Sequence, residues 1–299
     1  MHAGSTQVPQ HLGCAFHTLP NRRVLRGRCA TCKAAPAPQR VSEADLLGNG
    51  DSQQHHPDAL HHAPRSPFYT GGMDVMTAGA AQALTDKPIT TEKTIVIVRH
   101  GLATWSAEGR IQGSSNESEL TPFGREQAER VKEALSRMPF DSCFSSSLTR
   151  AKQTADIVWA GRQGKLIELD TLAEAYLGFL QGMSNTVASK QHADAYKCWR
   201  STPAQFCVEG RWPVKEVFVA AKKAWQTMLQ AEGSLHLVVT HKSIARALLC
   251  VALGILPEGF RAIDVHNGGI CIFRVNKKGE PMLINLNLNS HMHMENIHY

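Results

Sequence analysis

The chain has 299 residues, 42% of them hydrophobic, and this length and composition allow one or two ordinary globular domains. Its formal charge is +6, but residues 1–42 hold six Lys or Arg and no acid, which leaves 26 basic against 26 acidic residues at positions 43–299. A formally neutral body lacks the electrostatic support that nucleic-acid binding needs, so we exclude nucleic-acid partners. The longest apolar stretch, residues 247–256, is half of a bilayer span, so no membrane span is expected.

Residues 1–42 have the composition of a targeting segment. They contain arginines, serine, threonine and many alanines, and they lack the long apolar core of a secretory signal. We expect them to be an organellar transit peptide, and a basic tail is the alternative. Cys29 and Cys32 have the spacing of a redox or metal pair, but no second pair follows at zinc spacing, so we attribute them to the leader.

Residues 43–90 are predicted to be a flexible linker. They are poor in aromatic residues and rich in His, Pro, Gly, Ala and Gln. His55–His56 and His61–His62 lie in this segment without a helix or strand pattern to fix their geometry, so we expect no metal site there. The folded domain is placed at residues 91–299.

Strands and helices are expected to alternate through this domain. Short apolar runs predict strands at 94–98, 143–144, 166–169, 235–240, 269–275 and 281–288. Helices are predicted from Thr121–Pro122, over 148–160, along the apolar face 218–228 and over 243–254. Residues 170–213 are expected to be an irregular insertion over a pocket. The alternation predicts an α/β fold, a three-layer α/β/α sandwich with a mostly parallel sheet.

Charged and imidazole side chains follow several of the predicted strands. Arg99, His100 and Gly101 come directly after the first strand, and His241 follows the strand at 235–240. A third strand ends at Ser145, and Arg150 lies one turn into the next helix. Because the carboxyl ends of parallel strands share one edge of a sheet, these groups should meet in one crevice. Two arginines, two histidines and a helix N-terminus describe a site for a dianionic phosphate.

Each residue type suits phosphoryl transfer. Arginine offers a planar fork of donors and stays protonated, and a neutral imidazole has a nitrogen lone pair that attacks phosphorus. His241 can donate to the phosphoryl oxygens as charge shifts in the transition state. The leaving alcohol needs a proton, and Glu174 follows the third strand at a suitable place for that acid. Taken alone, Glu174 is more simply a surface glutamate, so its role depends on the wider pattern.

Five sequence blocks carry a family resemblance. They are Arg99-His100-Gly101, Gly109-Arg110-Ile111-Gln112-Gly113, Leu120 to Ala128, Ser145 to Ala151 and Val239-Thr240-His241. In this order they resemble the histidine phosphatase, or phosphoglycerate mutase-like, superfamily over about residues 93–290. The resemblance implies that fold, with no metal and no cofactor, and a small phosphorylated substrate.

The same resemblance implies roles for individual residues. His100 would be the phosphorylated nucleophile, and Glu174 the proton donor and later the base. The transferring phosphoryl group would be held by Arg99, Arg150 and His241, and Ser106, Gln112 and Gly113 would lie near the substrate. Lys242 is the ninth predicted site residue, and it stands where family members often have glycine. We expect it either to bind a substrate carboxylate or second anion, or to be a solvent-facing lysine.

A closer resemblance is to the plant and algal chloroplast phosphatases of this superfamily. It lies in residues 99–106, 110–116 and 239–244, with further support from 174–175 through 181–183, 262–265 and 267–270. It implies a location in the chloroplast stroma and a small sugar phosphate, such as 2-carboxy-D-arabinitol 1-phosphate, as substrate. Leu102–Ala103 and Ser106 depart from the Glu-Thr and Asn that many family members have there.

Two other functions remain open from the sequence. A phosphoglycerate mutase-type phosphotransfer would return the phosphoryl group to the product, and the short tail after residue 288 favours hydrolysis instead. A non-enzymatic protein that keeps the fold is disfavoured by the complete set of Arg99, His100, Arg150, Glu174 and His241. The sequence indicates no particular oligomeric state.

Overall fold

The computed structural model describes residues 82–292, so the expected leader and most of the expected linker lie outside the described residues. Leu84 and Ile89 are both buried and belong to the hydrophobic core. The Leu84 N–H also donates to the Gly279 carbonyl at 2.9 Å. Packing against the core therefore begins before the predicted domain boundary at residue 91.

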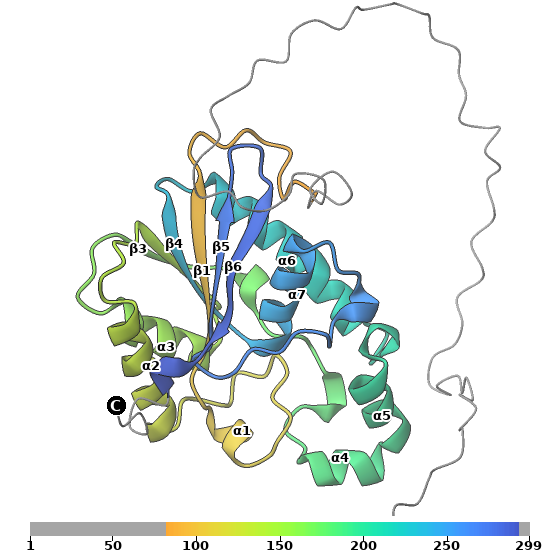
Figure 1. Ribbon diagram of the computed structural model, residues 1–299. Helices are drawn as coiled ribbons and strands as arrows, with labels where there is room; N and C mark the ends of the chain where they lie inside the picture. The colour runs from red at the N-terminus through yellow and green to blue at the C-terminus, as the bar shows by residue number, and fades with distance from the viewer. Residues whose placement is uncertain (1–81, 293–299) are drawn as a thin grey trace, which may run out of the picture.

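The described part of the chain alternates strands and helices, as predicted (Figure 1). In chain order the elements are β1 (Lys93–Arg99), α1 (Thr104–Ala107), α2 (Pro122–Ala134), β2 (Ser142–Ser145), α3 (Thr149–Trp159), β3 (Lys165–Glu168), α4 (Asn185–Gln191), α5 (Ala193–Ser201), α6 (Pro213–Gln230), β4 (Leu235–Thr240), α7 (Lys242–Ala252), β5 (Ile270–Val275) and β6 (Pro281–Leu288). Short 3₁₀ turns connect several of them. No helix within residues 82–292 is long and apolar enough to cross a membrane.

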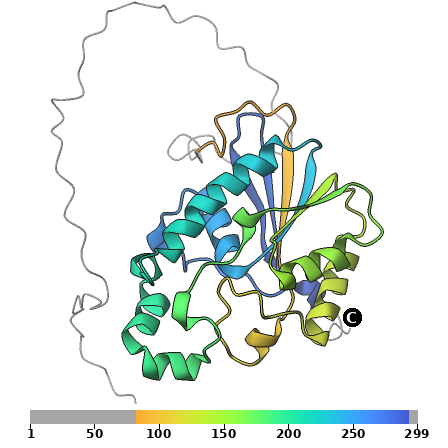
Figure 2. The same ribbon diagram turned by 180° about the vertical axis from the view of Figure 1, so that it is seen from behind.

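The six strands form one mixed sheet in the order β3-β2-β4-β1-β5-β6. The first four strands in this order run parallel to one another, and β5 is antiparallel to both β1 and β6. Helices α2 and α3 pack on one face and α6 and α7 on the other (Figures 1 and 2). The predicted α/β sandwich with a mostly parallel sheet is therefore confirmed.

Strand β1 lies at the centre of the sheet because its side chains are apolar on both faces. Ile95, Val96, Ile97 and Val98 are all fully buried, with Ile95 and Ile97 packed toward α6 and α7 and the two valines toward α2 and α3. A parallel strand covered on both faces needs this continuous apolar run. The pairing of Arg99 with Thr240 brings the ends of β1 and β4 side by side.

Helix α2 begins where the sequence predicts. The Thr121 hydroxyl accepts a hydrogen bond from the Gly124 N–H at 2.9 Å, and Pro122 occupies the first turn. Threonine suits this position because its oxygen satisfies a backbone donor that the helix leaves unpaired. Proline suits the first turn because it has no N–H to leave unpaired.

The prediction that residues 170–213 are irregular is wrong. They contain α4 and α5, and the Ser184 hydroxyl caps α4 by accepting from the Val187 N–H at 3.1 Å. Trp199 and Cys198 of α5 are buried in the core. In Figure 1, α4 and α5 lie beside α1 at the end of the molecule where the parallel strands have their carboxyl ends. The insertion thus forms a helical wall next to those strand ends.

Candidate active site

The two predicted histidines lie side by side at the carboxyl ends of β1 and β4. Their ring centroids are 4.9 Å apart, and the backbone N–H of His100 donates to the Thr240 carbonyl at 2.9 Å. His100 is 2% exposed and His241 is fully buried. The parallel pairing of β1 with β4 therefore brings together two residues that are 141 positions apart in the sequence.

Hydrogen bonding determines which nitrogen of His100 carries its proton. Nδ1 lies 2.7 Å from the Gly101 carbonyl oxygen, which only accepts, so Nδ1 carries the proton and Nε2 keeps its lone pair. Burial, together with the charges of Arg150 and Arg99, holds the pKa of His100 well below the usual histidine value. The ring is therefore neutral at physiological pH, which is the form that acts as a nucleophile.

Gly101 is required by packing at the start of α2. A Cβ at this position would lie 2.2 Å from the Gly124 carbonyl oxygen. Glycine is therefore needed here for a close contact between two backbone segments. This contact holds the exit from β1 against α2.

Arg150 is fully buried on the first turn of α3. Its two Nη atoms donate to the carbonyls of Ser115 and Gly113, each at 2.8 Å, while its buried Nε finds no hydrogen-bond partner among residues 82–292. Burial lowers the pKa of Arg150 to about 10, with Glu174 acting in the opposite direction, so the group remains a cation. The arginine both ties down the 113–115 loop and keeps one donor unused.

His241 is oriented by Ser146, the first residue after β2. The Ser146 hydroxyl lies 2.7 Å from His241 Nε2 and also accepts from the Leu148 N–H at 3.2 Å. Within the described chain, His241 Nδ1 is buried without a partner. Burial and the charge of Arg150 lower the pKa of His241 well below the usual histidine value, so this ring is neutral too.

Arg99 and Glu174 are the remaining charged residues predicted for the catalytic role, and they line the same cavity. Arg99 Nη1 donates to the Val265 carbonyl at 2.9 Å, and burial lowers its pKa to about 10 although Glu174 acts to raise it. Both carboxylate oxygens of Glu174 accept from the Ser243 N–H at 3.1 Å, at the start of α7. A helix N-terminus is a favourable place for a carboxylate.

A cavity of about 240 Å³ opens above this cluster. Six of the nine predicted site residues line it, namely Arg99, Ser106, Gln112, Gly113, Glu174 and Lys242. The other three, His100, Arg150 and His241, are buried next to it. Of the six buried side-chain atoms that lack a hydrogen-bond partner within residues 82–292, four belong to predicted site residues: Arg99 Nε, Arg150 Nε, His241 Nδ1 and Gln112 Oε1. Because buried polar groups are normally paired, three donors of this kind around one cavity point to an anionic ligand.

The remaining predicted substrate contacts differ in how they reach the cavity. Gln112 donates through Nε2 to the Ser106 hydroxyl, which fixes both side chains at the rim. Gly113 has a φ of +52°, and its carbonyl accepts from Arg150, so its backbone acts through that arginine. Lys242 forms an ion pair with Asp264 at 2.8 Å, so the structure does not show it as a simple solvent-facing lysine.

Three residues next to the site were not singled out from the sequence. Asn267 donates through Nδ2 to the His100 carbonyl at 2.9 Å, and Arg246 and Arg261 line the cavity. Their loops and helix positions give no pattern of their own, and only the folded arrangement brings them to the strand ends. Among residues 82–292, no three His, Cys, Asp or Glu side chains gather in a group that could hold a metal ion.

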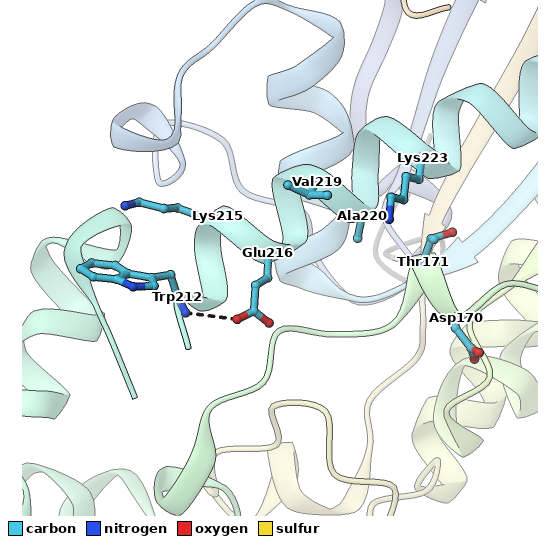
Figure 3. Close-up of a pocket in the computed structure, with 8 residues that line it drawn as sticks. All are labelled: Asp170, Thr171, Trp212, Lys215, Glu216, Val219, Ala220 and Lys223. Atoms are coloured by element: carbon cyan, nitrogen blue, oxygen red, sulfur yellow. Dashed lines mark hydrogen bonds between the residues drawn. The ribbon is translucent and has the colours of Figure 1, made fainter. Parts of the chain in front are cut away.

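A larger hollow of about 540 Å³ lies along the outer side of α6 (Figure 3). Its lining comes from α6, from Trp212 just before it, and from Asp170 and Thr171, and within the described residues it shares no side chain with the catalytic cavity. The backbone N–H of Trp212 donates to the Glu216 carboxylate at 3.2 Å, as drawn in Figure 3. The predicted site residues therefore belong to the smaller cavity.

An α/β sandwich with a neutral histidine, a buried and a half-buried arginine and a carboxylate at its strand ends defines a class of phosphoryl-transfer proteins. Residues 95–288 match the sequence profile of the histidine phosphatase superfamily (branch 1). The chain belongs to this superfamily. The predicted family and fold are thereby confirmed, as is the assignment of the domain to the phosphatase enzymes of that superfamily.

Curated relatives and solved structures agree with this assignment. The chain is 39% identical over 184 residues to a protein of Arabidopsis thaliana named "Probable 2-carboxy-D-arabinitol-1-phosphatase", covering 62% of this chain and 38% of the relative. It is 37% identical over 202 residues to 2-carboxy-D-arabinitol-1-phosphatase of Triticum aestivum, covering 67% and 41%. The chain thus spans about two fifths of the length of these two relatives. The structure of Bacillus stearothermophilus YhfR shares the fold, with a TM-score of 0.64, 24% identity and coverage of 67% of this chain and 99% of that one.

Proposed function

We propose that this protein is a metal-independent phosphomonoesterase that works through a phosphohistidine. Its proposed substrate is a small sugar phosphate such as 2-carboxy-D-arabinitol 1-phosphate. The observation that carries this proposal is the tautomer of His100: its Nδ1 donates to the Gly101 carbonyl, so Nε2 is the basic atom of a ring that lies near the buried Arg150 and the half-buried Arg99. The names of the two plant relatives support the choice of substrate class.

In the first step, His100 Nε2 attacks phosphorus and the ester P–O bond breaks as the N–P bond forms. The departing alkoxide takes a proton from the carboxyl group of Glu174. Arg99 Nε, Arg150 Nε and His241 Nδ1, all buried and unpartnered within residues 82–292, are the donors for the three non-bridging oxygens. A Ser146 hydroxyl that donates to His241 Nε2 puts the proton of that ring on Nδ1, where this role needs it.

In the second step, a water molecule attacks the phosphorus of phospho-His100. The Glu174 carboxylate takes a proton from that water, the N–P bond breaks and inorganic phosphate leaves. The Ser243 N–H donates to the carboxylate and so stabilises the ionised form that serves as the base. The two arginine charges take the part that metal ions have in other phosphoryl-transfer sites.

The test measures phosphate release by the full chain from a panel of sugar phosphates in the presence of a chelator. We expect turnover without added metal, and a His100→Ala variant should lose it. A rapid-quench experiment with labelled substrate should trap label on the protein in an acid-labile, alkali-stable form. His236→Gln is a matched control because His236 is also a buried histidine, on β4, but lies outside the site.

Three results would decide against the proposal. Undiminished turnover by His100→Ala would exclude this histidine as the nucleophile. Isomerised phosphate ester without free phosphate would show mutase-type transfer instead of hydrolysis. Turnover that depends on an added divalent metal would contradict the metal-independent mechanism.

We also propose that the protein acts in the chloroplast stroma. The support is the composition of residues 1–42, which hold six Lys or Arg and no acid. A fusion of residues 1–42 to a fluorescent protein should be imported into isolated chloroplasts and shortened there. Failure of import would favour the basic-tail interpretation.

A further inference from the structure

The outer wall of the catalytic cavity is strongly basic. Besides Arg99, the cavity is lined by Lys242 and Arg246 of α7, Arg200 of α5 and Arg261 of the loop before β5. Two helices and a loop therefore contribute cations to one small space. The phosphoryl site described above uses only Arg99 of this group.

Arg261 is held in place and still has an unused donor. Its Nη2 donates to the Trp199 carbonyl at 2.5 Å, and its guanidinium carbon lies 5.2 Å from the centre of the Trp199 ring. Its buried Nε has no hydrogen-bond partner in the described part of the chain. Burial and the neighbouring cations Arg246 and Arg200 lower its pKa to about 10. An immobilised guanidinium with a buried, unpaired N–H is arranged to bind an anion.

Arg246 and Lys242 form the adjoining part of the wall. Arg246 is 7% exposed and donates to the Ile263 carbonyl and to Asp264, both at 2.7 Å. The same Asp264 carboxylate pairs with Lys242 at 2.8 Å. Burial acts to raise the pKa of Asp264, but Lys242 and Arg246 outweigh it and lower that pKa. The single carboxylate of Asp264 is thus shared by Lys242 and Arg246, so these three side chains together keep one positive charge.

The charges around the cavity do not balance with one phosphate. Five cations, namely Arg99, Arg150, Lys242, Arg246 and Arg261, lie around the cavity with the carboxylates of Glu174 and Asp264, which leaves three positive charges. Arg200 is not counted because it is exposed, and Arg110 is not counted because it pairs with Glu108 at 3.2 Å. A phosphate monoester dianion neutralises two of the three. Uncompensated charge in a partly buried cavity is unfavourable, so a second anionic group fits the remaining one.

We propose that Arg261, with Lys242 beside it, binds a second anionic group of the substrate and selects doubly anionic sugar phosphates. The second group is a carboxylate or a second phosphate of a small molecule that fits a cavity of about 240 Å³. This inference rests on the proposed phosphatase function. It assigns specificity to a wall built from α5, α7 and the loop before β5, and it leaves the chemistry to the strand ends.

The test compares three substrates that differ only in the second group: D-arabinitol 1-phosphate, 2-carboxy-D-arabinitol 1-phosphate and D-arabinitol 1,5-bisphosphate. The wild-type protein should prefer one or both of the doubly anionic compounds, and this result also separates carboxylate from phosphate. Arg261→Gln should lower kcat/KM for the preferred compound by about 10- to 100-fold, and for the singly anionic one by less than about threefold. Lys242→Met should act in the same direction.

Arg137→Gln is the matched control because it removes the same charge from an exposed arginine in the segment between α2 and β2. It should leave the ratio between substrates unchanged. Thermal melting of each variant detects loss of folding, and Arg261→Lys serves in place of Arg261→Gln if that variant is unstable, since lysine keeps the charge but not the planar fork.

Equal losses on all three substrates, or a wild-type protein without preference, would overturn the assignment of Arg261 while leaving the phosphatase function intact. Phosphate release from none of them, nor from p-nitrophenyl phosphate, would instead contradict the proposed function. In that case calorimetric binding to His100→Ala still decides the inference: tighter binding of a doubly anionic compound supports it, and equal binding of all three refutes it.

Discussion

Acid should destabilise this protein through a buried histidine that takes no part in the chemistry. His236 on β4 is fully buried, and its Nδ1 lies 2.8 Å from the Ser142 hydroxyl. Burial and the charge of Lys93 lower its pKa from 6.5 to about 4, although Asp141 acts to raise it. The folded state therefore keeps this ring neutral at a pH where the unfolded chain already protonates it.

The sign and size of the effect follow from linkage. Between pH 6.5 and 4 the unfolded state binds the proton and the folded state does not, so stability falls as the pH falls. At about 1.4 kcal/mol per pKa unit, the complete loss from His236 is about 3 kcal/mol, and most of it is present by pH 4.5. His100 and His241 have lowered pKa values as well and add to the loss in the same direction.

Urea unfolding at pH 7.5, 6.5, 5.5 and 4.5 measures this effect, with the buried Trp225 as a fluorescent reporter. The comparison is between the wild type and His236→Gln, because both retain His100 and His241 and differ in the titrating group on β4. The variant should be less stable at pH 7.5, by about 1 kcal/mol for the altered bond to Ser142, and should lose less stability on acidification. Parallel curves for the two proteins would refute the reasoning.

Three further predictions concern the site and its support. Glu174→Gln should slow phosphohistidine formation from an alkyl phosphate by about 10²- to 10⁴-fold and much less from p-nitrophenyl phosphate, whose leaving group needs no proton; rapid-quench rates measure this, and equal slowing would contradict the acid role. Ser146→Ala should reduce kcat by about 10- to 100-fold because His241 Nε2 loses its partner, and steady-state assays with wild-type kcat would show that the partner is unnecessary. Thr121→Ala should lower the free energy of unfolding by about 1 kcal/mol through loss of the α2 cap without changing KM, and urea midpoints together with KM test both halves.

The strand ends could be predicted from the sequence because their information is local. The run from Ile95 to Val98 is apolar on both faces, which predicts a central strand, and Arg99 and His100 come directly after the run. His241 follows a second such strand. The rule that parallel strands share an edge then brings the two rings together without any knowledge of the helices.

The wall of the cavity could not be predicted in the same way. Helices α4 and α5 have 7 and 9 residues, too short for a clear helical period, and the buried Trp199 reads equally well as a loop residue. Arg261 is held at the cavity by its hydrogen bond to the Trp199 carbonyl, and Trp199 lies 62 positions earlier in the sequence. The need for glycine at position 101 likewise comes from a contact with Gly124 on α2, which no local pattern in the sequence shows.

Arg150 couples the length of the loop at 113–115 to the geometry of the site. Both of its Nη atoms are engaged by carbonyls of that loop, and only Nε is left over. An insertion or deletion in the loop would therefore withdraw two acceptors from a buried cation and turn its remaining donor away from the nucleophile. The length of the loop is thus fixed by a residue of another element, α3.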